Sequence, residues 1–374
     1  MQIEKTKFHS WKIGQIAKGC ELCVKGQKLV LFVTGVCGQD CFFCPLSEQK
    51  KNRDVIYANE WPITTYEDII TEAKLTEAKG AGITGGDPLL RLARTVEIIK
   101  LLKESFGRQF HIHLYTPLTN ISWENLKELH LAGLDEIRFH PELDNKAHWE
   151  RITFSKRFDW DVGIEIPALP GFEKQTLELI DFVHDKIDFL NLNELEISST
   201  NAENLAKLGY YTKNEVSYGV KGSEELAMKL LGHCEKLGLK THYCTTTLKD
   251  KEQLAKRILR RAKNVARKFD KITGEGMLIR GAVYLNGLEA GFNYRDRITK
   301  ANKKEAIVLL NALKVMLTKR FSLSHEMTAI DEIKLRLLTS ESIARRIAGK
   351  IDNKCAVVEE YPTYDQFEIE VEIL

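Results

Sequence analysis

Short apolar runs alternate with stretches of helical period along about the first 250 residues of this 374-residue chain, and this alternation limits the folds open to it. The runs lie at residues 28–33, from 81 onward, and at 110–115, 136–139, 162–166 and 189–197. Their length and composition are typical of strands buried on both faces of a parallel sheet. Strands and helices in this order predict an α/β fold, a partial (β/α)6 TIM-like barrel, with 240–244 as a candidate further strand.

The length of the chain, at 42.8 kDa, predicts more than one domain. We expect a core at 28–248, preceded by an N-terminal segment at 1–27, and a basic helix at 249–272. Residues 273–374 predict a smaller α+β domain. Within it we expect strands at 277–285, 356–361 and 366–374, a helix at 301–320, and more helix within 323–349.

Cys37, Cys41 and Cys44 form a C-x3-C-x2-C motif directly after the first predicted core strand. Three thiolates at this spacing can hold three irons of a [4Fe–4S] cluster and leave the fourth iron open to a small molecule. Zinc is an alternative, although it prefers four ligands, and unrelated thiols are another. Eight cysteines in the whole chain and no apolar secretory leader argue against a disulfide framework.

Gly85-Gly86-Asp87-Pro88 ends the second predicted strand. The two glycines let the backbone approach a ligand closely, and the proline ends the strand. Such a string alone is usually an ordinary turn. Next to the cysteine motif, at the carboxyl edge of the same predicted sheet, it indicates a binding site.

These two motifs resemble those of the radical S-adenosylmethionine (radical SAM) enzymes. Phe43 fills the family's aromatic position before the last cysteine, and Asp87 replaces the glutamate of its usual Gly-Gly-Glu-Pro motif. The resemblance covers about residues 28–248. Cys44-Pro45-Leu46-Ser47 looks closest to an archaeal group described as related to pyruvate formate-lyase activating enzymes.

The resemblance implies a [4Fe–4S] cluster on Cys37, Cys41 and Cys44, bound SAM, and an electron donor such as ferredoxin or flavodoxin. Reductive cleavage of SAM would then give a 5′-deoxyadenosyl radical. By position, the SAM contacts would be Phe43, Gly85, Gly86, Asp87, His113, Tyr115 and Arg138. Two of these have simpler explanations: Arg138 as an ion pair with Glu136 or Asp135, and His113 as a hydrogen-bonded interior histidine.

Cys20 and Cys23 form a C-x2-C pair before the first core strand. Together with Cys244, and with His242 beside it, they could bind a second metal, either zinc or an iron–sulfur cluster. The alternative is a pair of reduced thiols in a turn.

Residues 249–271 contain ten basic residues and three acidic ones in a chain whose net charge is only +2. An amphipathic helix with one positive face predicts contact with a phosphate backbone, which suggests RNA, and tRNA in particular. The alternative is a solvated helix paired with acidic neighbours.

Three functions therefore stay open: modification of RNA, activation of a partner protein through a glycyl radical, and a non-catalytic iron–sulfur or zinc-binding module. The cysteine content favours a reducing, cytoplasmic compartment. No apolar stretch is long enough to span a membrane.

Overall fold

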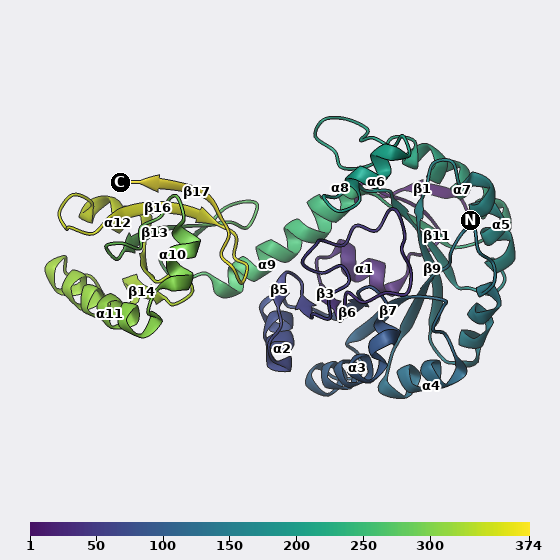
Figure 1. The fold of residues 1–374 in the computed structure, drawn as a ribbon, viewed down its shortest axis with the longest axis horizontal. Helices are drawn as coiled ribbons and strands as arrows, with labels where there is room; N and C mark the ends of the chain where they lie inside the picture. Colours follow the sequence, from purple (N-terminus) through teal and green to yellow (C-terminus); the bar gives the residue numbers. More distant parts are fainter. The chain divides into compact units, whose positions relative to one another are not determined.

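The computed structural model describes all 374 residues, and the chain divides into two compact units, Met1–Lys256 and Arg257–Leu374 (Figure 1). The division falls inside the segment predicted as a basic helix. Each unit has its own sheet and its own apolar core.

The first unit is built on an eleven-stranded sheet whose central strands are all parallel. In spatial order these are β11 (Thr241–Cys244), β10 (Phe189–Glu194), β9 (Asp161–Ala168), β8 (Glu136–His140), β7 (His111–Pro117), β6 (Gly80–Thr84) and β3 (Lys28–Phe32). Sequence neighbours lie side by side, as right-handed crossovers require. The predicted partial barrel is confirmed, and β11 adds a parallel strand at the candidate position.

Short antiparallel strands end the sheet on both sides. β2 (Trp11–Ile13) pairs with β11 and carries β1 (Ile3–Lys5), while β4 (Tyr57–Ala58) pairs with β3 and carries β5 (Trp61–Pro62). The N-terminal segment is therefore part of the sheet. Because β1 and β5 do not pair with each other, the barrel stays open.

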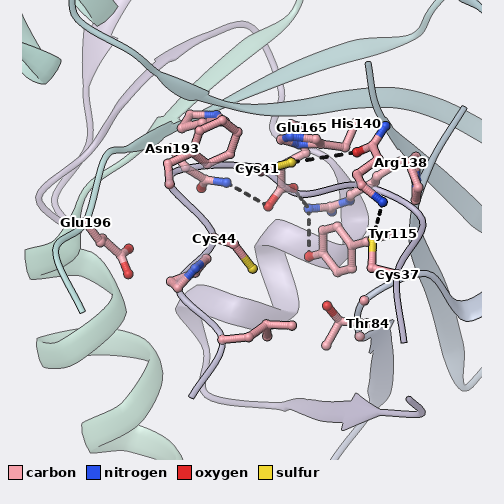
Figure 2. Close-up of a pocket in the computed structure, with 18 of the residues that line it drawn as sticks. Cys37, Cys41, Cys44, Thr84, Tyr115, Arg138, His140, Glu165, Asn193 and Glu196 are labelled. Atoms are coloured by element: carbon pink, nitrogen blue, oxygen red, sulfur yellow. Dashed lines mark hydrogen bonds and ion pairs between the residues drawn. The ribbon is translucent and has the colours of Figure 1, made fainter. Parts of the chain in front are cut away.

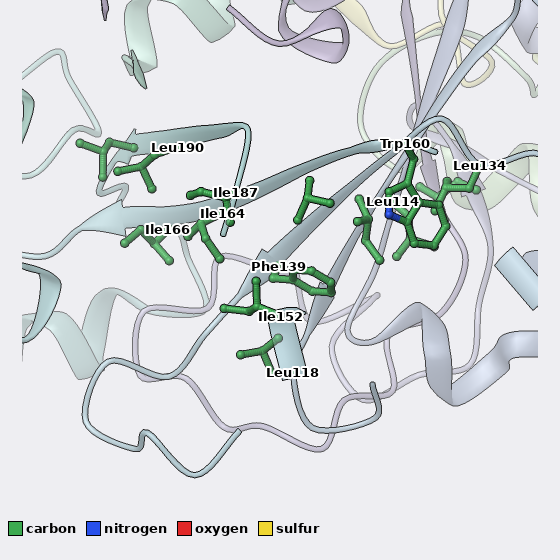
Figure 3. Packing of buried hydrophobic residues seen from close by; sticks show 14 of the residues in the cluster. Leu114, Leu118, Leu134, Phe139, Ile152, Trp160, Ile164, Ile166, Ile187 and Leu190 are labelled. Carbon is green, nitrogen blue, oxygen red and sulfur yellow. The ribbon is translucent and has the colours of Figure 1, made fainter. Parts of the chain in front are cut away.

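Helices cover the outer face of this sheet (Figure 1). They are α2 (Tyr66–Leu75), α3 (Leu92–Phe106), α4 (Trp123–Ala132), α5 (Glu173–Val183) and α7 (Ser223–Leu237), while α6 (Ala202–Lys207) lies in the segment between β10 and α7. Figure 3 shows the apolar layer, in which strand residues such as Leu114, Phe139 and Ile164 are fully buried. This layer holds the helices to the sheet because it removes the apolar face of each element from water.

The opposite face of the same strands is polar. Side chains alternate along a strand, so Ile112 and Leu114 of β7 point to the outer core while His111, His113 and Tyr115 point inward. The same alternation in β8, β9 and β10 gives the barrel an interior of charged and amide groups instead of the apolar layers that fill a closed barrel.

Helix α1 (Lys18–Val24) lies within the ring of strands (Figure 1) and contacts β3, β6 and β7. Its Gly19 N–H donates to the Glu136 carboxylate over 3.1 Å. A Cβ on Gly19 would lie 2.5 Å from the Arg138 guanidinium and 2.7 Å from the His113 ring. Glycine is therefore needed for the helix to pack against the polar interior.

The second unit has a sheet in the order β14 (Thr328–Asp331), β15 (Arg336–Thr339), β13 (Leu278–Tyr284), β16 (Cys355–Glu360) and β17 (Glu368–Ile373), with β12 (Lys271–Ile272) also paired to β13. Its helices are α10 (Tyr294–Lys300), α11 (Lys303–Arg320) and α12 (Glu341–Ile347). This is the predicted α+β fold. None of the helices in the chain combines the length and the apolar character needed to cross a membrane.

The helix expected within 323–349 is α12, and the first half of that range forms the hairpin of β14 and β15. A buried ion cluster connects this hairpin to the neighbouring strand. Buried Arg336 of β15 pairs with Asp331 of β14 and with Glu360 of β16, at 2.9 and 2.5 Å. These carboxylates are far from Arg336 in the sequence or across a turn, so local periodicity does not reveal them.

The expectation of one helix at 249–272 is wrong, and its basic residues do not all lie on a free face. Lys249–Leu254 is a π-helical turn after α8 (Thr246–Leu248), and α9 (Ala255–Val265) ends before β12. Arg257 and Arg261 are buried. Other basic residues pair with carboxylates, as Lys256 does with Glu252 and Lys268 with Glu326, at 2.5 and 2.6 Å.

We predict that Gly19→Ala destabilises the first unit by about 1–3 kcal/mol, because the new methyl group overpacks the contact with Arg138 and His113. Urea unfolding followed by tryptophan fluorescence measures this, since all five tryptophans lie in that unit. Gly232→Ala in α7 is the control. No atom lies within 4 Å of its new methyl group, so it should stabilise by roughly 0.5–1 kcal/mol. Equal effects of the two variants would contradict the packing described for α1.

Candidate functional site

A cavity of about 460 Å³ opens at the carboxyl ends of the parallel strands (Figure 2). Its wall includes Cys37, Cys41 and Cys44 from the loop after β3, and Gly85 and Gly86 from the loop after β6. Deeper in the barrel it is lined by Lys28, Tyr115, Arg138, Glu165 and Asn193. The two sequence motifs and the polar interior therefore belong to one site.

The cysteine loop is closed at its base by backbone bonds and by one carboxylate. Gly35 N–H donates to the Arg53 carbonyl over 2.7 Å. Asp54 then accepts from Arg91, Arg94 and Thr34 at 2.6 to 2.9 Å. The hydrogen bond from Arg94 has the largest effect on the pKa of Asp54 and helps to hold it well below its usual range. The Asp54 carboxylate is therefore charged at neutral pH.

The three thiols of this loop are partly buried and unpaired by disulfides. Burial, and then the neighbouring Cys44 and Cys37 sulfurs, raise the pKa of Cys41 to about 12. Thiolates this close together need a bound cation. A [4Fe–4S] cluster binds each thiolate to a different iron, so three thiolates on one loop can hold three of its irons.

The glycine loop lies directly against the cysteine loop. Gly86 N–H and Asp87 N–H donate to the carbonyls of Thr34 and Val36, each over 2.8 Å. A Cβ on Gly85 or Gly86 would lie 2.3 Å from those same carbonyl oxygens. The two glycines are therefore required for the loops to meet, and they leave bare backbone at the cavity wall.

Asp87 turns away from the cavity. Its carboxylate is fully buried and accepts from Thr116 at 2.8 Å, Asn120 at 2.6 Å and Leu89 N–H at 3.0 Å. Burial raises the pKa of Asp87 although these donors oppose it. The side chain thus joins the end of β6 to the end of β7.

Arg138 is held between two carboxylates inside the barrel. It contacts Glu136 at 2.5 Å and Glu165 at 2.6 Å, and it donates to the Tyr115 hydroxyl over 3.2 Å. Burial would raise the pKa of Glu165, but Arg138 and the amides of Asn193 and Asn191 outweigh it and lower the pKa to about 2. The ion pair with Glu136 named above as the simpler explanation is present.

His113 is fully buried and does not line the cavity. Its Nε2 lies 3.2 Å from the Tyr115 hydroxyl, and burial lowers its pKa well below the usual value. Ligand atoms of His111, His113 and Glu136 lie within 4.8 Å of one another. Arg138 and the Gly19 N–H already compensate the Glu136 charge. The Arg138 guanidinium thus already supplies, at Glu136, the positive charge that a bound cation would bring.

Comparison with known proteins agrees with this geometry. Residues 31–183 match the family model described as the radical SAM superfamily. A Methanocaldococcus jannaschii protein, provisionally named a glycyl-radical enzyme activating enzyme, is 45% identical over 291 residues, 75% of this chain and 77% of that protein. The chain belongs to the radical SAM superfamily.

More distant similarities cover less. A biotin synthase from Clostridium perfringens is 26% identical over 191 residues, 48% of this chain and 56% of that enzyme. Among solved structures, methylornithine synthase has 15% identity and a TM-score of 0.38, covering 59% of this chain and 71% of its own.

Membership makes this chain a radical SAM enzyme that uses a [4Fe–4S] cluster and SAM. The residues fit both groups. Three thiols on one loop face a cavity that has an adjoining wall of bare glycine backbone.

Three cavity residues of this radical SAM enzyme were not predicted from the sequence. Lys28, at the start of β3, lies 3.5 Å from the Tyr115 hydroxyl. Lys249 and Gln253 come from the turn before α9, and Lys249 pairs with Glu196. Lys28 and Val30 are two residues apart in β3, so their side chains point to the same inward face. This alternation was the sequence signal that could have identified Lys28. The other two were assigned to a solvent-facing helix, so no sequence signal placed them here.

The second-metal prediction concerns Cys20 and Cys23 of α1 and Cys244 at the end of β11. Cys23 packs with Leu248 and Cys244, and the Cys20 sulfur accepts from Asn191 over 3.2 Å. The three sulfurs do not form a set within 4.8 Å, and they are free thiols. A second metal there stays a prediction.

We predict that Cys41→Ala abolishes cluster binding, because two thiolates cannot hold a cubane on three of its irons. Iron and sulfide content after anaerobic reconstitution, with the cluster's visible absorption, measures this. Cys355→Ala, at a buried thiol of β16 in the second unit, is the control and should keep wild-type iron content. Retention of the cluster in Cys41→Ala would exclude this loop as its ligand.

We predict that Glu165→Gln lowers the stability of the first unit by about 3 kcal/mol at pH 7, from a folded pKa of about 2 against an ordinary value of about 4.3. The stabilisation that ionised Glu165 gives the folded state is complete above about pH 5. It is lost as the pH falls from the pKa of Glu165 in the unfolded chain toward its lower pKa in the folded protein. The wild-type advantage should therefore shrink by roughly 1 kcal/mol by pH 3.5. Urea unfolding at both pH values tests it, and an advantage that is independent of pH would refute the assignment.

Proposed function

We propose that this radical SAM enzyme activates a partner protein by taking a hydrogen atom from a glycine of that partner. The observation that carries the proposal is 45% identity, over 75% of this chain, to the M. jannaschii protein named for that activity. When bound, the reduced cluster and SAM supply the 5′-deoxyadenosyl radical that this step requires. The reductant would be a small electron carrier such as ferredoxin or flavodoxin.

The size of the cavity supports this assignment. About 460 Å³ lies in the lower part of the roughly 300–1,000 Å³ range of ligand sites, and SAM would occupy much of it. A second reactant would have to enter as a slender segment. A glycine in an extended loop meets that condition, since it brings only backbone to the reacting carbon.

Each part of the site has its own task in this proposal. Cys37, Cys41 and Cys44 would hold the cluster, while the backbone at Gly85 and Gly86 would receive the methionine end of SAM, with Asp87 fixing that loop from behind. Phe43 and Tyr115 would lie along the adenosine. Arg138 and His113 would keep the floor of the site rigid rather than reach SAM. Arg138 is ion-paired with Glu136 and Glu165, and the Nε2 of His113 lies at the Tyr115 hydroxyl.

Two earlier hypotheses have less support. RNA modification depended on a free basic face at 249–272, but its arginines at 257 and 261 are buried and several of its lysines are paired with carboxylates. A non-catalytic module is at odds with family membership. The eight free thiols fit the reducing compartment predicted from the sequence.

The proposal predicts two separable results under anaerobic reduction. Wild-type enzyme should release 5′-deoxyadenosine from SAM, and Cys41→Ala should release none above background. With a candidate partner added, an organic radical should appear by electron paramagnetic resonance (EPR) on that partner, and a Gly→Ala change in its reactive loop should remove it. SAM cleavage without any partner radical, together with RNA binding that weakens steeply with salt and in Lys263→Glu, would favour the RNA hypothesis instead.

A further inference from the structure

The segment between β10 and α7, residues 195–222, leaves the barrel and returns to it (Figure 1). It lies beyond the residues that match the family model, 31–183. Its first residues, Leu195 and Glu196, line the cavity. This segment also contacts the cysteine loop at two neighbouring residues, Phe42 and Phe43.

Asn201 makes the polar contact. Its side-chain amide donates to the Phe43 carbonyl over 2.9 Å and to the Glu196 carbonyl over 3.0 Å, and its oxygen accepts from Ser198 N–H over 2.7 Å. The residue is only 1% exposed. The side-chain nitrogen and the side-chain oxygen of Asn201 are therefore both hydrogen-bonded. The two bonds that Asn201 donates need an amide nitrogen.

The Phe43 carbonyl belongs to the peptide bond that leads into Cys44. Cys44 N–H already donates to the Cys41 carbonyl over 3.0 Å, which makes a turn between two cluster ligands. The bond from Asn201 fixes the rotation of the same peptide plane. It thereby sets where the Cys44 sulfur lies and how the local backbone dipoles face the metal, two factors that tune the reduction potential of an iron–sulfur cluster.

Phe42 supplies a second contact of a different kind. Its ring stacks on Phe172, from the loop after β9, at 6.0 Å and on Tyr210 at 6.3 Å. This packing secures the loop through apolar area, without directing any backbone dipole. The two contacts can therefore be removed separately.

We propose that Asn201 is a positioning residue for the cluster: by holding the Phe43 carbonyl, it orients the Cys44 ligand and tunes the reduction of the iron–sulfur centre. The inference rests on radical SAM chemistry and is independent of the partner on which the enzyme acts. The segment that carries Asn201 also forms part of the cavity wall. It therefore connects that wall to the loop that holds the cluster.

The test uses the full-length, reconstituted enzyme with Asn201→Leu, which keeps the approximate size of the side chain and removes its donors without adding a charge. At a fixed potential the ratio of reduced to oxidised cluster should change about tenfold, which corresponds to a shift of about 59 mV for one electron. The EPR spectrum of the reduced cluster should change with it. Release of 5′-deoxyadenosine at saturating SAM should fall about tenfold while iron content stays at the wild-type level.

Two further variants keep the test decisive. Asn214→Leu, at an exposed asparagine of the same segment, should leave potential, spectrum and rate unchanged. Phe42→Leu should lower thermal stability without moving the potential. If Asn201→Leu does not fold, Asn201→Ser, which is too short to reach the carbonyl, replaces it. A wild-type potential and spectrum in a folded Asn201 variant, or an equal shift in Phe42→Leu, would overturn the proposal.

Discussion

The two-residue alternation of the parallel strands is the constraint on which the rest of the first unit depends. Along β7, Ile112 and Leu114 bind the outer helices while His113 and Tyr115 face the barrel interior. A one-residue slip of any strand would exchange the two faces, placing charges in the apolar layer. The same register therefore fixes the core, the open barrel and the position of every polar group beneath the cluster site.

A polar interior is stable only if its charges are compensated, and here they are. Arg138 lies between Glu136 and Glu165, while Gly19 of α1 contributes a backbone donor from inside the ring. Replacing one partner of such a set leaves a buried charge, which is costly. The floor of the cavity is thus rigid, and the reactive part is carried by loops at the strand ends. Those loops depend on each other, since the glycine loop can approach the cysteine loop only without side chains at 85 and 86.

Sequence reasoning succeeded where local pattern and local chemistry agree. The βα order was confirmed, and the cysteine loop and the glycine loop meet at one edge of the sheet, as parallel strands require. It failed where distant partners decide the outcome. The basic segment at 249–272 is not one helix with a free positive face, since two of its arginines are buried and several of its lysines are paired with carboxylates. Asn201 gave no signal, since its partner is a backbone carbonyl 158 residues away.

The sequence by itself determined the chemistry that starts the reaction: three thiolates at a fixed spacing, an aromatic residue beside the last, and a glycine pair at the next strand end. These are short-range patterns, so no tertiary information was needed. Only the tertiary structure decided which charges are free. Arg138 forms ion pairs with Glu136 and Glu165 inside the barrel. In residues 249–272 two arginines are buried, and several lysines are paired with carboxylates. The reason is that the strength and availability of a charge depend on its neighbours in space, which a linear chain does not specify.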